Sequence, residues 1–202
     1  MENTLKQQGF IIVLGKLLKY KGTEVDLTIP DCVKSISDFA IPAHVRTVRF
    51  GANVTKIEAE AFGALDEESD LETIYYDGTV EDWLKIGFGG YAEGPDGCGP
   101  VSGNPMLRAQ NVYFQGELLT DIVIPPTVDK IGAGQFQGLK QAHTIRFGAS
   151  VKTIEIAAML WSGINTIYFD GTEDEWDEIY FDDCSLPEKY SLYIQGKLVK
   201  AN

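Results

Sequence analysis

The side chains in this sequence that most often bind metals or act as nucleophiles and bases are three cysteines and two histidines. They are Cys32, Cys98, Cys184, His44 and His143. A structural zinc site needs about four such ligands close together, often with a Cys-x-x-Cys pair. The cysteines here are widely spaced and no such pair occurs. We therefore expect no metal site, and we expect three free or buried thiols.

A catalytic nucleophile needs an adjacent base and a group that orients that base. His44 lies in Pro-Ala-His-Val and His143 in Ala-His-Thr-Ile, each just ahead of a predicted strand and outside any motif such as Gly-x-Ser-x-Gly. The acidic runs at 66–68 and 182–183 are most simply solvated loops. We expect no catalytic residues, no enzymatic activity and no bound cofactor.

Two Asp-Gly-Thr stretches, at 77–79 and 170–172, could in principle contribute calcium ligands. A calcium loop needs a run of alternating oxygen ligands, and none follows either stretch. Asp-Gly is a turn pair in which glycine is free to take a positive φ. The stretches therefore predict turns rather than metal sites.

A short helix is predicted to follow each turn. Thr79 and Thr172 are placed as N-caps, and an acidic residue three positions later completes a capping box in both cases. The tryptophans that follow, Trp83 and Trp176, should lie on the buried side of these helices.

Several short segments of the chain recur in the same order at an offset of about 95 residues. The matched segments are Ile29-Pro30 with Ile124-Pro125, 50–54 with 147–151, and 74–79 with 167–172. The order and spacing predict a single repeat domain over 1–202 that is built from a duplicated module. We place module one at about 10–110, module two at about 111–190, and the start of a third module at 191–202.

Module one is longer than module two because of an insertion at 87–103 that holds seven glycines. The segment has neither Gly-x-Gly-x-x-Gly nor Gly-x-x-x-x-Gly-Lys-Ser, so it is no phosphate-binding loop. We interpret it as a flexible loop on the edge of the fold. The alternative is a loop that contacts a partner.

Within each module a finer unit of twenty-odd residues recurs, the period of leucine-rich repeats. Each unit has a short strand, a turn and then Val-x-x-Ile, as at Val54 and Ile57 or Val128 and Ile131. A single unit cannot bury its apolar edge, so neighbouring units stack and share one core. The predicted fold class is an α/β repeat solenoid of short β-strands with short helices and turns.

The net charge is -13. A surface this acidic repels phosphate backbones and anionic lipids, so nucleic acid is not expected as a partner. No segment has the ~20 apolar residues that a membrane span requires, and membrane insertion is not expected. No signal peptide is visible in this chain.

The sequence resembles the BspA-type leucine-rich repeat family of bacterial surface proteins. The resemblance rests on Ile29-Pro30 before Val33-x-x-Ile36, Ile124-Pro125 before Val128-x-x-Ile131, Ala61-Phe62, and the aromatic, Asp-Gly-Thr, Trp pattern. The resemblance covers about 10–199. The sequence departs from the family pattern at Met159, which stands where module one has Phe62, and in the long glycine loop. The resemblance implies a right-handed solenoid, a surface or secreted location, protein or matrix partners, and no catalytic residues.

A row of outward side chains is the candidate binding site. Side chains alternate across a strand, so the middle residues of the strands should face solvent and line up between coils. The candidate partner-binding residues are Arg49, Tyr75, Tyr113, Arg146 and Tyr168, with Thr28, Val123 and Tyr193 extending the row. Arginine and tyrosine are enriched at interface hot spots. The alternative is that the arginines only pair with nearby carboxylates while the tyrosines cover the sheet.

The expected function is a non-catalytic, protein-binding repeat domain in adhesion or host or matrix interaction; the alternative is a structural spacer that displays another domain.

The chain stops a few residues into a fresh repeat and no capping helix follows. We expect either that the chain was cut from a longer array or that it associates end to end with a second copy through its uncapped ends. Since the three cysteines lie in different parts of the sequence, we expect no intrachain disulfide.

Overall fold

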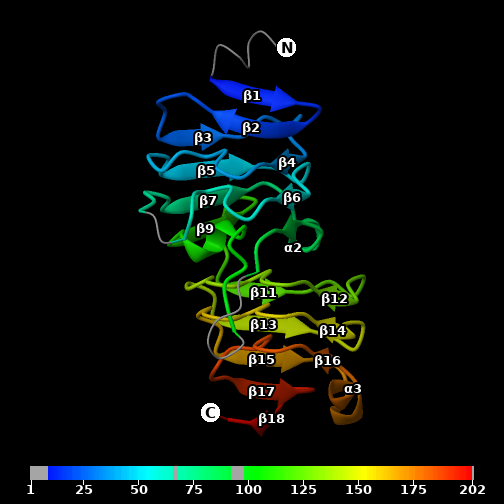
Figure 1. Ribbon diagram of the computed structural model, residues 1–202. Coiled ribbons are helices and arrows are strands. Elements are labelled where there is room, and N and C mark those ends of the chain that lie inside the picture. Colours follow the sequence, from blue (N-terminus) through cyan, green and yellow to red (C-terminus); the bar gives the residue numbers. More distant parts are fainter. Residues whose placement is uncertain (1–8, 66–67, 92–97, 202) are drawn as a thin grey trace.

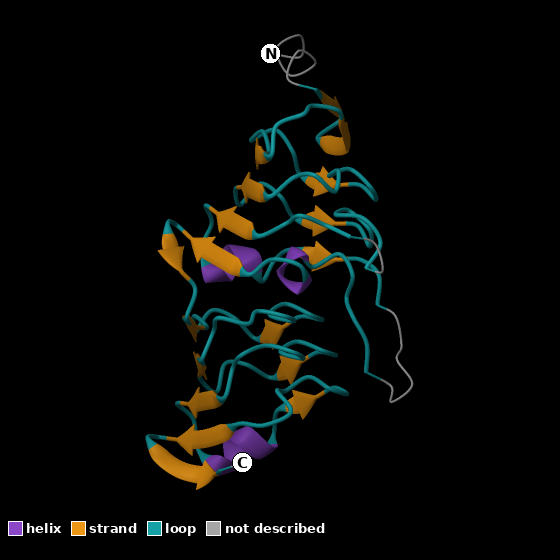
Figure 2. Cartoon of the chain, turned by 90° about the vertical axis from the view of Figure 1, so that its left-hand side faces the viewer, coloured by secondary structure: helices purple, strands orange, loops and turns teal. Residues whose placement is uncertain are grey.

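The chain coils into a stack of turns that runs from the N-terminus at one end to the C-terminus at the other (Figure 1). The computed structural model describes residues 9–65, 68–91 and 98–201. Two columns of strands run along the stack, a front ladder and a back ladder, and they are seen on opposite sides in Figure 2. Within the described ranges, no helix is long and apolar enough to cross a membrane.

The front ladder holds most of the strands of three or more residues. Its strands are β3 (Asp26–Thr28), β5 (Thr47–Phe50), β7 (Thr73–Tyr76), β9 (Asn111–Phe114), β10 (Glu117–Leu118), β11 (Asp121–Val123), β13 (Thr144–Phe147), β15 (Thr166–Phe169), β17 (Ser191–Ile194) and β18 (Lys197–Lys200). The back ladder consists of β1 (Phe10–Val13), β2 (Lys16–Tyr20), β4 (Ser35–Ile36), β6 (Lys56–Ile57), β8 (Gly87–Phe88), β12 (Lys130–Ile131), β14 (Thr153–Ile154) and β16 (Tyr180–Phe181).

Alternation of apolar and polar residues explains the front strands. In β5, Val48 and Phe50 are buried while Arg49 is exposed, and in β7 Ile74 and Tyr76 are buried in the same way. β5 and β7 pair in parallel, with Val48 beside Ile74. The inward side chains of both ladders form one core between them, as predicted for stacked repeat units.

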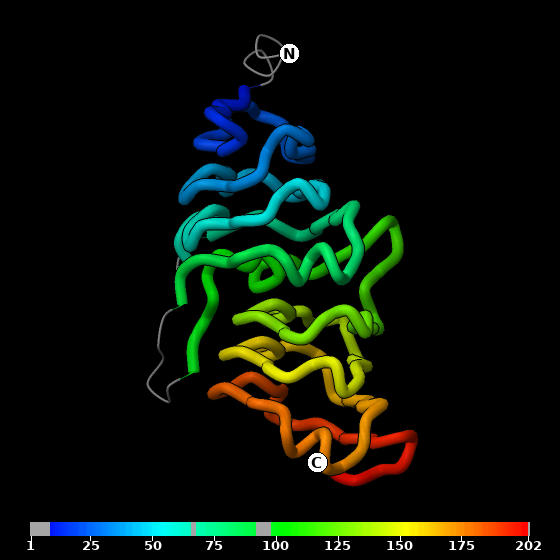
Figure 3. The backbone as a smooth tube through the Cα atoms, turned by 90° about the vertical axis from the view of Figure 1, so that its right-hand side faces the viewer, coloured from blue at the N-terminus to red at the C-terminus, as the bar shows by residue number. Residues whose placement is uncertain are grey.

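Both ladders are interrupted at the same level, which divides the fold into a first stack (β1 to β10) and a second stack (β11 to β18). The front ladder breaks between β10 and β11, and the back ladder breaks between β8 and β12. The gap between the two groups of strands is visible in Figures 1 and 3. Side chains, rather than strand pairing, must therefore join the stacks.

Buried polar side chains make this junction. The side chain of Gln135 donates to the backbone oxygen of Ile86 at 2.9 Å, and Asn104 donates to the backbone oxygen of Gly134 at 2.6 Å. Trp83 donates from its indole nitrogen to the backbone oxygen of Gln135 at 2.8 Å. Each bond satisfies a group that is shut off from water, where an unpaired polar atom is costly.

Three hairpins share one turn geometry. They carry Leu14-Gly15, Gln115-Gly116 and Gln195-Gly196, and both residues of each turn have positive φ, between 49° and 88°. Positive φ at both central residues defines the type I′ turn, which suits the twist of a hairpin. The hairpins lie where the three modules are predicted to begin. The division into duplicated modules stays a prediction.

The two predicted capping boxes are present. Thr79 caps α2 (Val80–Trp83), and Thr172 caps α3 (Glu173–Asp177), each with a reciprocal bond to the third residue of its helix. Trp83 is fully buried among aromatic rings at 5.2–6.1 Å, as predicted. Trp176 is only partly buried, although it packs on Phe147 and Phe169 in the same manner.

The glycines of the Asp-Gly-Thr stretches were expected to be there because they can take a positive φ, and this expectation is wrong. Neither Gly78 nor Gly171 has a positive φ. Instead, a Cβ at either position would lie 2.6 Å from the ring of the aromatic residue two positions earlier, Tyr76 or Phe169. Glycine is required there because the buried ring passes directly beneath the turn.

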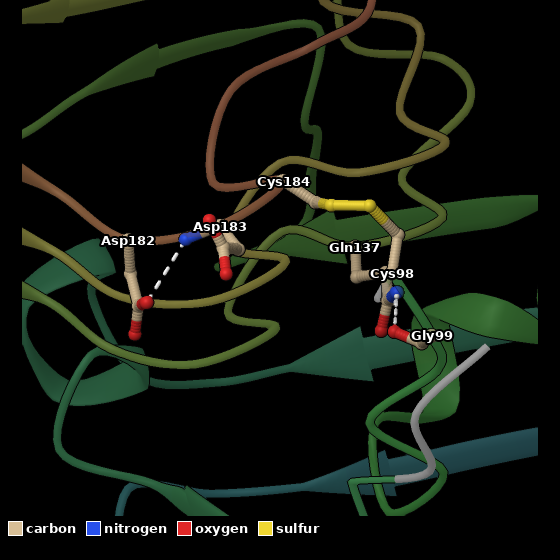
Figure 4. Close-up of a disulfide and its surroundings, with 6 residues drawn as sticks. All are labelled: Cys98, Gly99, Gln137, Asp182, Asp183 and Cys184. Atoms are coloured by element: carbon tan, nitrogen blue, oxygen red, sulfur yellow. Dashed lines mark hydrogen bonds between the residues drawn. A yellow bond between two sulfur atoms is a disulfide. The ribbon is translucent and has the colours of Figure 1, made fainter. Parts of the chain in front are cut away.

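The expectation of no intrachain disulfide is also wrong, because Cys98 and Cys184 are bonded to each other (Figure 4). Their Cα atoms lie 5.8 Å apart, within the range that a disulfide spans. Sequence spacing did not reveal this, because it gives no sign that residues 98–101 lie against the second stack, where Gln137 bonds to Gly99 and Val101. Cys32 is a free, exposed thiol.

Residues 98–103, the C-terminal part of the glycine segment, are held in place by hydrogen bonds. Gln137, fully buried, accepts a hydrogen bond from the backbone nitrogen of Val101 at 2.7 Å and donates to the backbone oxygen of Gly99 at 2.9 Å. Together with the disulfide, these bonds make the segment a brace across the junction. Residues 92–97 lie outside the described part of the chain, and a partner contact by the loop stays a prediction.

Candidate binding face

The predicted outward residues of the first stack form one continuous row across the front ladder. Thr28 lies beside Arg49, Arg49 beside Tyr75, and Tyr75 beside Tyr113, each pair in cross-strand register. Thr28 and Arg49 are exposed, and the two tyrosines are partly exposed. The structure thus brings three of the five candidate residues together as neighbours.

Each member of this row is held by its neighbours. Arg49 donates to both carboxylate oxygens of Asp77, at 2.9 and 2.7 Å. This bidentate bond and the carboxylate charge raise the pKa of the Arg49 guanidinium above its ordinary value. The guanidinium also lies 5.8 Å from the Tyr75 ring centre, and Tyr75 stacks on Tyr113 at 4.8 Å. The row is therefore ordered before any partner arrives.

The second stack repeats this arrangement. Val123, Arg146, Tyr168 and Tyr193 follow one another in register across β11, β13, β15 and β17. Arg146 bonds to Asp170 at 2.5 Å and lies 4.9 Å from the ring of Tyr168, which stacks on Tyr193 at 5.2 Å. Tyr193 thus completes the second row as Tyr113 completes the first.

A second outward row runs parallel to the Arg–Tyr rows and is rich in hydroxyl groups. Its members are Asp26, Thr47, Thr73 and Asn111 in the first stack, and Asp121, Thr144, Thr166 and Ser191 in the second. Hydrogen bonds from the hydroxyls of Thr144 and Thr120 lower the pKa of Asp121. We call the surface formed by both kinds of row the front face.

The chemistry of the front face suits recognition. Asp77 and Asp170 offset the arginine charges, yet the two arginine side chains remain 49% and 47% exposed. A partner can therefore contact the guanidinium edges, the tyrosine hydroxyls and the threonine hydroxyls at the same time. Within 9–65, 68–91 and 98–201, no cluster of three or more His, Cys, Asp or Glu side chains is grouped so as to hold a metal ion.

Sequence reasoning offered carboxylate pairing of the arginines as an alternative but did not identify the carboxylates. Asp77 and Asp170 were interpreted as turn residues, but each also lies one coil below its arginine. The signal was present, because an aspartate follows Tyr76 and Phe169 at the end of the strand that pairs with the arginine strand. No such signal exists for Gln135, which bonds to Trp83 and Ile86 of the first stack. None exists for Gln137, which bonds to Gly99 and Val101 of the glycine segment.

The ladders, stacked coils and shared core define a leucine-rich-repeat solenoid. Residues 109–199 match the family described as the BspA type leucine rich repeat region, in six copies. A comparison with curated proteins gave no match.

Among solved structures, the chain is similar to a leucine rich cell surface protein from Faecalibacterium prausnitzii A2-165. The two share 18% sequence identity with a TM-score of 0.44, over 92% of this chain and 52% of that protein. The chain therefore spans about half the length of that protein.

Proposed function

We propose that this chain is a non-catalytic domain that binds a protein or matrix macromolecule through the front face. The observation that carries the proposal is the pair of rows in which arginine, tyrosine and tyrosine adjoin in strict register. Arginine and tyrosine are the residue types that dominate interface hot spots. Side chains that are already ordered lose little conformational entropy on binding, which favours affinity.

The alternative function, a structural spacer, has no need of two aligned aromatic rows. The arginines do pair with carboxylates, as the alternative interpretation of the row expects. Exposed ion pairs of this kind contribute only about 0–1 kcal/mol to stability. Stability alone is therefore a weak reason for the repeated Arg–Asp–Tyr arrangement, and this favours the binding domain.

The proposed setting is the surface of a bacterium or its secreted fraction, in adhesion or in host or matrix interaction. Disulfides persist in oxidising compartments and are rare in the cytosol, so the Cys98–Cys184 bond supports an exported protein. The net charge of -13 favours a protein or matrix partner over nucleic acid.

The test compares binding by front-face and back-face variants. The immobilised chain is used to capture partners from extracellular matrix and neighbouring-cell surface proteins. The affinity of any captured partner is then measured for Arg49→Ala with Tyr168→Ala, and for the control Lys56→Ala with Tyr180→Ala on the back ladder. The proposal expects a loss of at least ~100-fold for the first pair only. Equal affinity of a folded front-face variant would contradict it.

A further inference from the structure

An unusual backbone position holds an exposed tryptophan, Trp161, on the second stack. Trp161 has φ of 58°, the left-handed region, and its side chain is 49% exposed. One coil earlier the corresponding bend is held by Gly138, with φ of 75°, whose backbone nitrogen bonds to the oxygen of Leu160. The chain thus places a bulky side chain where the neighbouring coil has glycine.

Such a position is unfavourable for tryptophan on two grounds. Left-handed φ is strained for a large side chain, and a half-exposed indole gives up much of the burial that stabilises a core tryptophan. The indole of Trp83, by contrast, is wholly buried and hydrogen-bonded. Backbone strain that packing does not explain is concentrated at binding sites.

The indole borders a hollow of about 310 Å³ at the edge where the chain enters β15 and β17. This size is at the lower end for small-molecule sites. Polar side chains share the wall with Trp161 and Pro187; they are Ser162, Asn165, Glu188 and Lys189. The formal charges of Glu188 and Lys189 cancel, so the wall favours an uncharged ligand.

The polar groups of the wall have hydrogen-bonding capacity to spare. The hydroxyl of Ser162 donates to the backbone oxygen of Met159, which leaves its oxygen free to accept. Asn165 accepts from Thr166 through its oxygen, and its amide nitrogen has no partner within the described residues. Among the residues that the structure describes, Glu188 likewise has no ion-pair partner and no side-chain hydrogen-bond partner.

We propose that this hollow binds neutral carbohydrate, with a sugar ring stacked on the indole of Trp161. A pyranose presents a face of C–H groups, which suits the electron-rich face of an aromatic ring, and a rim of hydroxyls, which suits amide, carboxylate and ammonium groups. The site is separate from the Arg–Tyr rows of the front face. Its failure would leave the proposed protein-binding function untouched.

The test follows the indole N–H signals of the ¹⁵N-labelled full chain by NMR. The probes are neutral cello-, manno- and chito-oligosaccharides, and Trp161→Phe assigns the Trp161 signal. At least one series is expected to shift that signal, and Trp161→Ala is expected to weaken binding by ~10-fold or more. Tyr180→Ala, which removes an exposed aromatic on the back ladder, should bind normally.

Trp161→Gly separates a binding role from a structural one. Glycine relieves the left-handed strain, so this variant is expected to melt no lower than the parent chain while binding no saccharide. If Trp161→Gly instead lowers the melting temperature as a core truncation does, the indole is structural and the proposal is overturned. It is also overturned if no oligosaccharide series shifts the Trp161 signal.

Discussion

The indole nitrogen of Trp83 donates a hydrogen bond to the backbone oxygen of Gln135, 2.8 Å away, and so ties the last coil of the first stack to the first coil of the second. Trp176 follows the same Asp-Gly-Thr signal and packs on Phe147, Phe169 and Phe181, but within the described residues its indole makes no such bond and it is only partly buried. One local sequence pattern therefore has two environments, decided by what lies on the next coil.

Replacing Trp83 tests how much the junction depends on this bond. Trp83→Phe leaves the oxygen of Gln135 unpaired and opens a cavity, so we expect a loss of about 2–4 kcal/mol in the free energy of unfolding. Trp176→Phe, the matched control, should cost about 1 kcal/mol or less, because its site is half open. Urea denaturation measures both, and equal losses would contradict the junction role.

Removing the disulfide should loosen the brace. The bond closes a sequence separation of 86 residues, and loops of this size are stabilised by about 2–4 kcal/mol. We expect Cys98→Ser or Cys184→Ser to lower the unfolding free energy by this amount and Cys32→Ser to have no effect. Peptide mapping of the unreduced chain should recover one bridged pair. Three free thiols in chain purified under oxidising conditions would refute the assignment.

The glycines of the chain should differ sharply in their tolerance of alanine. A Cβ at Gly171 meets the buried ring of Phe169, and we expect Gly171→Ala to cost about 1–3 kcal/mol. At Gly148 a Cβ has nothing within 4 Å and φ is not positive, so Gly148→Ala should be neutral or stabilise by about 0.4–1 kcal/mol. Thermal unfolding distinguishes the two, and similar melting temperatures would argue against the ring contact.

Stability should fall in acid because some carboxylates are better stabilised in the folded chain. Hydrogen bonds from Thr144 and Thr120 lower the pKa of Asp121, and bonds from Thr79 lower that of Asp82. A depressed folded pKa gives stability that is present above the ordinary value near 4 and is lost as pH falls through the folded pKa. Melting temperature should therefore drop below about pH 4. Asp121→Asn should make the fall of the melting temperature in acid smaller. If the melting temperature of this variant depends on pH as that of the parent chain does, the role of Asp121 is contradicted.

Exposed strands at the two ends predict association between chains. The turn residue Leu14 is fully exposed at one end, and Leu198 and Val199 are about half exposed on β18 at the other. Apolar edge strands of this kind pair readily with other chains. We expect sedimentation to show concentration-dependent association, which Leu198→Lys should weaken. A monomer at all concentrations would rule this out.

Local patterns were enough to predict much of the fold. The inward and outward residues of β5 and β7, both capping boxes and the repeat period follow from alternation, helix capping and spacing, which act over a few residues. The Arg–Tyr rows followed as well, because parallel strands in register align their middle residues. The hydrogen bonds of Gln135 and Gln137 at the junction and the Cys98–Cys184 bond did not, because they depend on how distant segments meet.

The brace has a mechanical consequence. Residues between Cys98 and Cys184 lie inside a covalent loop, so a force that pulls the two ends of the chain apart passes through the sulfur–sulfur bond. The 86-residue separation corresponds to roughly 300 Å of extended chain that stretching cannot release until the bond is reduced. Under tension the covalent loop, which includes β9 to β16, acts as a short, inextensible link, and only the rest of the chain lengthens.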